Sequence, residues 1–172
     1  MDHLKDEAWI NTITETLTRN QARNYINHVM IPELLELPER RALANKILLT
    51  CRQYLQVRVN NKPQPPADWS RQVPDAAGDK KQWQLLKAFL ESPVEQIFDY
   101  RKNQSERNGM KYTIGRVVID LKTETIKKGS PHTLRIIKTQ AEYKRKMKDW
   151  NEDLELLKKI EITDYIFSEH RQ

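Results

Sequence analysis

A proline-rich stretch, residues 60–79, constrains the fold of this chain more than any other feature. It contains Pro63, Pro65, Pro66 and Pro74, and it closes near Gly78. Proline has no backbone N–H and a fixed φ, so no continuous helix can pass through the stretch, and extended polyproline II is favoured. We predict a tethered connector in which Trp69 and Val73 pack on the core. The alternative is a proline-rich ligand for a recognition domain.

The connector divides the chain into three predicted parts. Residues 1–60 form an N-terminal helical region, residues 61–79 the Pro-rich connector, and residues 80–172 a basic α+β module. A chain of 172 residues can build one ordinary core or two small subdomains. We expect the module to pack with residues 1–60 as one compact unit.

A long helix is predicted from Pro38 to about Val59, because apolar residues recur there at helical spacing. Its inward face comprises Leu43, Ile47, Cys51 (or Thr50) and Tyr54. Cys51 is the single cysteine, which excludes an intramolecular disulfide and any cysteine-based zinc site. Its place in the apolar stripe favours a buried structural thiol over a reactive one.

The tetrad Ser92-Pro93-Val94-Glu95 carries the residue types of a helix start. Serine is a preferred N-cap, proline fits the first helical turn, and glutamate three residues after the cap can bond back to it. The sequence therefore predicts a new helix after Ser92, with Ile97, Phe98 and Arg101 on it.

Two β-type segments follow, at about 117–125 and 133–138, where apolar or β-branched residues alternate with polar ones. Gly129 and Pro131 in the intervening segment are typical of a turn, so we predict a hairpin. Thr139, with a glutamate three residues later, predicts the N-cap of a long last helix. Its apolar stripe is Tyr143, Met147, Trp150, Leu154 and Leu157. The predicted fold class is mainly α, a helical bundle with a small β-hairpin and a long C-terminal helix.

Positive charge is concentrated in one region of the chain. Residues 101–160 carry 16 Lys and Arg against 8 Asp and Glu, whereas residues 1–100 carry 13 of each and residues 161–172 carry 1 against 3. Local charge of this kind favours acidic or phosphate-bearing partners. The candidate phosphate contacts are Arg116, Lys127, Lys128, Arg135, Lys138, Lys144, Arg145 and Lys148. The competing interpretation is a solvated surface without a ligand.

Motifs for catalysis, metal binding or nucleotide binding do not occur in the sequence. The four histidines are not at metal-ligand spacing, and neither a Gly-x-Gly-x-x-Gly nor a phosphate-loop motif is present. Ser130 and His132 lack a third residue that would orient the histidine. We therefore expect no catalytic residues, metal or cofactor, although an enzyme whose site is assembled from dispersed residues stays open. The acidic N-terminus and the lack of a long apolar run predict a cytoplasmic protein without a membrane span.

Residues 85–157 resemble a segment near the C-terminus of some large bacterial and fungal proteins that are related to 2-oxoglutarate/iron(II) oxygenases. The most specific part of the resemblance is residues 128–134 with Lys138, Thr139 and Tyr143. In those relatives a cysteine cluster precedes the helix that corresponds to residues 85–90, and here residues 75–81 hold no cysteine. The oxygenase iron ligands are absent as well. The resemblance implies an accessory domain separate from a catalytic partner.

These observations predict a non-catalytic accessory or protein-interaction domain of a cytoplasmic bacterial protein. Its candidate partner contacts are Tyr165, Ile166 and Phe167 in the apolar tail. The alternative is a nucleic-acid-binding module that uses the basic face of residues 116–148. An enzyme with a motif-free site is the third possibility.

Overall fold

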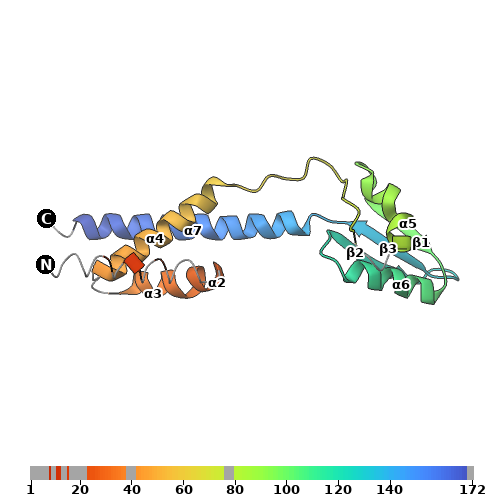
Figure 1. Cartoon of the computed structure of the whole chain (residues 1–172), viewed down its shortest axis with the longest axis horizontal. Coiled ribbons are helices and arrows are strands. Elements are labelled where there is room, and N and C mark those ends of the chain that lie inside the picture. The colour runs from red at the N-terminus through yellow and green to blue at the C-terminus, as the bar shows by residue number, and fades with distance from the viewer. Residues whose placement is uncertain are drawn as a thin grey trace. The chain divides into compact units, whose positions relative to one another are not determined.

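The computed structural model of the 172-residue chain describes residues 8, 11, 12, 15, 23–37, 42–75 and 80–169. The chain forms two compact units: residues 1–63 with 146–172 are unit 1, and residues 64–145 are unit 2. The described elements are mainly α-helices, with one small antiparallel sheet and a long C-terminal helix, which confirms this part of the predicted fold class (Figure 1). None of the described helices combines the length and the apolar character needed to cross a membrane.

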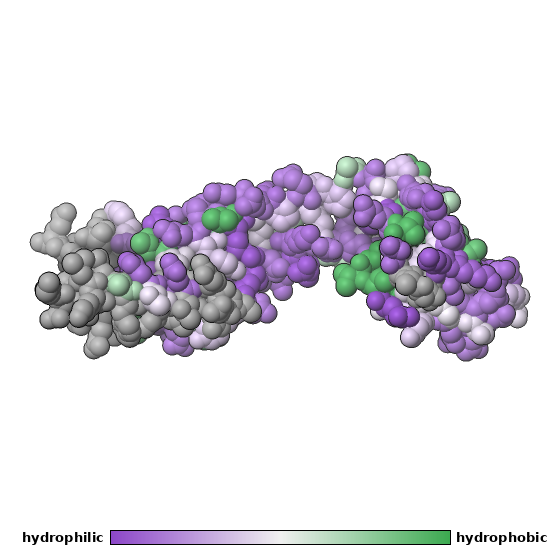
Figure 2. Space-filling view, in the orientation of Figure 1, coloured by the Kyte–Doolittle hydropathy of each residue, from purple (hydrophilic) through white to green (hydrophobic). Residues whose placement is uncertain are grey.

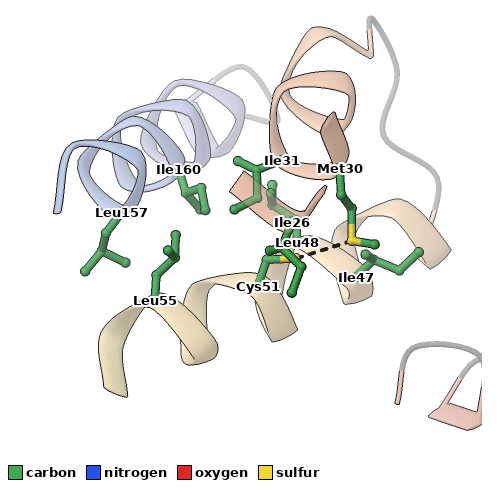
Figure 3. Close-up of a cluster of buried hydrophobic side chains, with 9 residues drawn as sticks. All are labelled: Ile26, Met30, Ile31, Ile47, Leu48, Cys51, Leu55, Leu157 and Ile160. Carbon is green, nitrogen blue, oxygen red and sulfur yellow. Dashed lines mark hydrogen bonds between the residues drawn. The ribbon is translucent and has the colours of Figure 1, made fainter. Parts of the chain in front are cut away.

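Unit 1 is helical in its described part. Its elements are α2 (Arg23–Tyr25), the π-helix η1 (Ile26–Met30), α3 (Ile31–Glu36), α4 (Ala42–Asn60) and the larger part of α7 (Ala141–Glu169). Their apolar side chains meet in one core, shown in Figure 3: Ile26, Met30, Ile31, Ile47, Leu48, Cys51, Leu55, Leu157 and Ile160. Fully burying one such aliphatic side chain contributes about 1.5–3 kcal/mol.

Helix α4 ends one residue beyond the predicted boundary and presents the predicted face to this core. Ile47 and Cys51 are buried as predicted. Leu48 and Leu55, each one residue after a member of the predicted face, are buried as well and widen this face. The Cys51 thiol lies 3.7 Å from the Met30 sulfur. Burial raises the pKa of Cys51 to about 11, which is the behaviour of a structural thiol.

The proline-rich connector has neither helix nor strand over residues 61–75. Its second half is bonded to unit 2, because Trp69 N donates to Pro93 O at 3.0 Å and Arg71 N donates to Leu90 O at 2.7 Å. Val73 packs against the apolar core of that unit. The predicted packing on the core is confirmed for Val73, whereas Trp69 is tied to unit 2 through its backbone N–H.

Unit 2 combines helices with a three-stranded sheet. Its elements are α5 (Lys80–Glu91), β1 (Ile97–Arg101), α6 (Gln104–Gly115), β2 (Leu121–Ile126) and β3 (Thr133–Lys138), followed by the start of α7. All strand pairs are antiparallel and the order is β1-β3-β2. One face of β3 carries Leu134 and Ile136, both fully buried against the helices together with Trp83, Leu86, Phe89, Leu90, Met110 and Ile114.

The helix predicted after Ser92 is wrong. The Ser92 hydroxyl does accept a hydrogen bond from Glu95 N at 3.1 Å, as a cap would, but the chain then enters strand β1. Gln96 O accepts from Lys138 N at 2.9 Å, and Ile97 begins the ladder with β3. Pairing with a central strand outweighs a local capping signal, since propensity is a weak determinant where tertiary contacts are available.

The predicted cap of the last helix is also wrong. Helix α7 begins at Ala141, and the Asp120 carboxylate accepts from Glu142 N at 3.0 Å. Thr139 N instead donates to Asp120 O at 2.8 Å. The cap is therefore supplied by the segment that precedes β2, which is remote in sequence. Of the predicted apolar stripe of this helix, Leu157 is fully buried, while Tyr143, Met147, Trp150 and Leu154 are half-buried.

Candidate phosphate-binding surface

The strand order brings two basic pairs to one end of the sheet in unit 2. Strands β1 and β2 both run antiparallel to β3, so their C-terminal ends lie on either side of its first residue, Thr133. Arg101 pairs with Thr133 from one side, and Ile126 pairs with it from the other. Arg101-Lys102 closes β1 and Lys127-Lys128 follows β2. In Figure 1 the β1–α6 connection and the β2–β3 loop lie at the same end of the unit.

Arginine side chains fasten the loop between β2 and β3 to this end. The Arg101 guanidinium donates to Ser130 O and to Pro131 O, each at 3.3 Å. His132 Nδ1 lies 2.9 Å from Gly129 O, inside the loop. Gly129 has a φ of 83°, which a residue with a Cβ adopts only with strain. These bonds tie the backbone of the loop to the sheet end, and among the described residues no hydrogen bond or ion pair engages the ammonium groups of Lys127 and Lys128.

The four cations of this end, Arg101, Lys102, Lys127 and Lys128, are called the basic end below. All four residues are exposed. Arg101 bonds backbone carbonyls, and in the part of the chain that the structure describes no carboxylate pairs with any of the four. Figure 2 shows a hydrophilic surface at this end of the unit. Uncompensated like charges at this density create a local positive potential that attracts anions.

The whole net charge of the chain belongs to the unit that carries the basic end. Residues 64–145 hold 16 Lys and Arg against 10 Asp and Glu, whereas residues 1–63 with 146–172 hold 14 of each. The formal net charge of +6 is therefore that of unit 2. The long-range field and the local cluster act in the same direction on an approaching anion.

Two of the predicted phosphate contacts are engaged inside unit 2. Arg135 forms a bidentate pair with Asp99, with both N–O distances at 2.8 Å, and this hydrogen-bonded guanidinium lowers the pKa of Asp99. Lys138 is 2% exposed and donates to Ser92 O at 2.7 Å, with its ammonium 4.7 Å from the centroid of the Phe89 ring. Burial lowers the pKa of Lys138. Lys138 is therefore buried away from a ligand, and the charge of the Arg135 guanidinium is compensated by Asp99.

The remaining predicted contacts lie away from the basic end. Arg116 caps the opposite end of α6, 5.5 Å from the Tyr112 ring centroid. Lys144 and Arg145 are exposed in the first turns of α7. Lys148 belongs to unit 1, where its ammonium lies 4.0 Å from Glu152. Only Lys127 and Lys128 of the eight predicted residues belong to the basic end.

Sequence reasoning missed Arg101 and Lys102. Their segment was assigned to a helix, so nothing connected them with a turn 25 residues further along the chain. A signal was available, because both basic pairs directly follow a segment of four to six residues that is rich in β-branched or aromatic side chains. The two basic pairs lie close together only because β1 and β2 both pair with β3.

Unit 1 holds a second polar feature, a cavity of about 280 Å³ between α4 and α7. Its lining residues are Val57, Arg58, Asn61, Pro63, Lys146, Asp149, Trp150 and Asp153. The Asp153 carboxylate is 1% exposed and is already bonded by three donors from Arg23, Asn27 and Arg58. The Asp153 carboxylate at this cavity therefore joins the helices of unit 1 to one another. Among the described residues, no three His, Cys, Asp or Glu side chains are grouped so as to bind a metal ion.

The candidate partner contacts of the apolar tail are described in part. Tyr165 is 64% exposed on α7, and Ile162, three residues earlier, is 60% exposed. The side chains of Ile166 and Phe167 lie outside the described residues.

Comparison of this chain with protein-family models, with curated proteins and with solved structures gave no match.

Proposed function

We propose that unit 2 is a non-catalytic nucleic-acid-binding module whose basic end contacts backbone phosphates. The observation that carries the proposal is the basic end itself: four exposed cations from two different strand ends, without a paired carboxylate among the described residues. Lysine and arginine on a rigid frame are the residues that bind phosphates, and counterion release makes each contact favourable.

The chemistry of the basic end favours binding without sequence selection. Its four residues are Lys and Arg on loops and strand ends, which contact phosphates, whereas bases stack on aromatic side chains. Affinity should therefore lie in the non-specific range, roughly 10⁻⁴–10⁻⁶ M at physiological salt. With four phosphate contacts, the slope of log K against log salt should be about −3.6 for duplex DNA and about −2.8 for a single strand.

The test is a titration of labelled duplex and single-stranded oligonucleotides at several salt concentrations, with a double variant and a matched control. Lys127→Gln with Lys128→Gln removes two cations of the basic end. Lys158→Gln with Lys159→Gln removes a lysine pair that is also exposed, on α7 in unit 1. The first pair should reduce the salt slope by about 2, since each phosphate contact contributes roughly 1.

The control pair should leave affinity and slope close to those of the parent. Equal losses in both double variants would show that total charge alone governs binding. Binding of the parent weaker than the non-specific range would remove the proposal.

A protein partner for α7 is the second candidate function, and one observation favours it. Ile162 and Tyr165 are both more than half exposed and, at a spacing of three residues, share a face of the helix. Exposed apolar side chains of this size are typical of contact surfaces. Replacing both by serine should abolish association with a protein partner and leave the salt slope of nucleic-acid binding unchanged.

The module is further proposed to act in the cytoplasm, beside a catalytic partner. The support is the resemblance of residues 85–157 to the accessory segment of oxygenase-related proteins, together with the lack of catalytic and metal-binding motifs in the sequence. Co-expression with such a catalytic domain, followed by a measurement of its turnover on nucleic-acid-linked and free substrates, tests this part.

A further inference from the structure

Arg107 is the side chain that connects the two basic pairs. It lies on the first turns of α6, and it is 7% exposed although it carries a charge. Its Nη1 atom donates to Lys102 O at 2.5 Å and to His132 O at 3.1 Å. One guanidinium nitrogen therefore bridges the backbone that follows β1 and the last residue of the loop that presents Lys127 and Lys128.

We propose that Arg107 is a positioning residue that holds the two basic pairs together as one phosphate-binding site. This inference rests on the proposed function and names how its surface is organised. The pairs lie on either side of β3, two strand spacings or about 10 Å apart. Held at that separation, they contact neighbouring phosphates of one nucleic-acid strand at the same time.

Arginine suits this role for a physical reason. Its planar guanidinium presents several N–H donors in fixed directions, whereas a lysine ammonium has the same charge on a flexible stem without that geometry. Fixing the backbone of both pairs before binding reduces the conformational entropy that is lost on binding. The Arg107 guanidinium itself faces backbone carbonyls in a buried position, so it supports the phosphate contacts of other residues.

The test compares two substitutions that leave the net charge unchanged. Arg107→Lys removes the fork and keeps the charge, and Arg135→Lys makes the same replacement on β3 at a residue paired with Asp99. Both are titrated with a labelled single-stranded oligonucleotide at several salt concentrations, and folding is checked by circular dichroism. Arg107→Lys should weaken binding about tenfold and reduce the salt slope by roughly 1, the loss of one phosphate contact. Arg135→Lys should bind like the parent.

A double-mutant cycle keeps the inference testable if Arg107→Lys does not fold. Lys102→Gln and Lys127→Gln change exposed side chains, one from each pair, and should leave the fold intact. In one joined site each single substitution removes a contact from the same complex and weakens binding, whereas with two independent sites each single variant keeps the other site and only the double variant loses binding. Single variants that both bind nearly like the parent, or a folded Arg107→Lys variant that does so, would overturn the inference. A parent protein that does not bind at all would instead overturn the proposed function.

Discussion

Replacing Asp153 should destabilise unit 1 more than any other single change of a charged side chain discussed above. Its carboxylate is 1% exposed. Oδ1 accepts from Arg23 Nη2 at 3.0 Å and from Asn27 Nδ2 at 2.6 Å, and Oδ2 accepts from Arg58 Nε at 2.6 Å. One residue of α7 thereby joins α2, η1 and α4. Asp153→Ala leaves all three donors without this acceptor.

The expected loss is about 3–5 kcal/mol, the usual effect of removing one partner from a buried charge pair. It is a large fraction of the roughly 5–15 kcal/mol by which folded proteins are stable. The side chains left behind cannot all reach water, since Arg23 is 16% exposed and Asn27 is 1% exposed. Asp153→Asn should lose less, because one oxygen acceptor and the shape of the side chain are retained.

Urea unfolding followed by circular dichroism measures the loss, and Glu155→Ala provides a matched control. Glu155 lies on the same helix, two residues further on, and is exposed. Its replacement should change the free energy of unfolding by no more than about 0.5 kcal/mol. With a urea m-value of about 1–3 kcal/mol/M, the Asp153→Ala midpoint should fall by at least about 1 M. Equal midpoints for the two variants would refute the argument that this buried network stabilises unit 1.

Three further predictions concern the two apolar cores and the absence, among the described residues, of side-chain groups that could bind a metal ion. The Cys51 thiol should resist thiol reagents at pH 8 in the folded protein and react once urea unfolds it. Burial raises the pKa of Cys51 from 9.0 to about 11, so the stability that the protonated thiol contributes is complete below pH 9 and is lost as the pH rises towards 11. Urea unfolding midpoints measured across that pH range test this. Ile136→Ala should lower the free energy of unfolding by about 2–5 kcal/mol. Ile137→Ala should lower it clearly less, because Ile137 is half-buried on the opposite face of β3. Equal losses would contradict the assignment of Leu134 and Ile136 to the inner face. The helical signal should persist in a chelator, and elemental analysis that found one zinc or iron per chain would contradict this.

The features that were predictable from sequence are those whose signals are local. Strand β3 occupies 133–138 as predicted, because β-branched and apolar residues alternate with polar ones throughout it. Strand β2 begins four residues later than predicted, at Leu121, because residues 116–120 form the connection from α6 that also carries the cap of α7. Helix α4 and its buried face were predictable from a 3.6-residue period sustained over several turns.

Only Lys127 and Lys128, half of the basic end, could be predicted from the sequence, because residues 97–101 were predicted to be helical. Alternation over five residues is too short to outweigh a capping signal that begins five residues earlier, so local sequence favours a helix and only pairing with β3 makes the segment a strand. In a helix, Arg101 would have belonged to a different surface from Lys127. As the closing residue of an edge strand, it lies opposite Thr133, beside the loop that carries Lys127. Where binding residues come from several strand ends, their grouping depends on strand order, which long-range pairing decides and local sequence patterns do not encode.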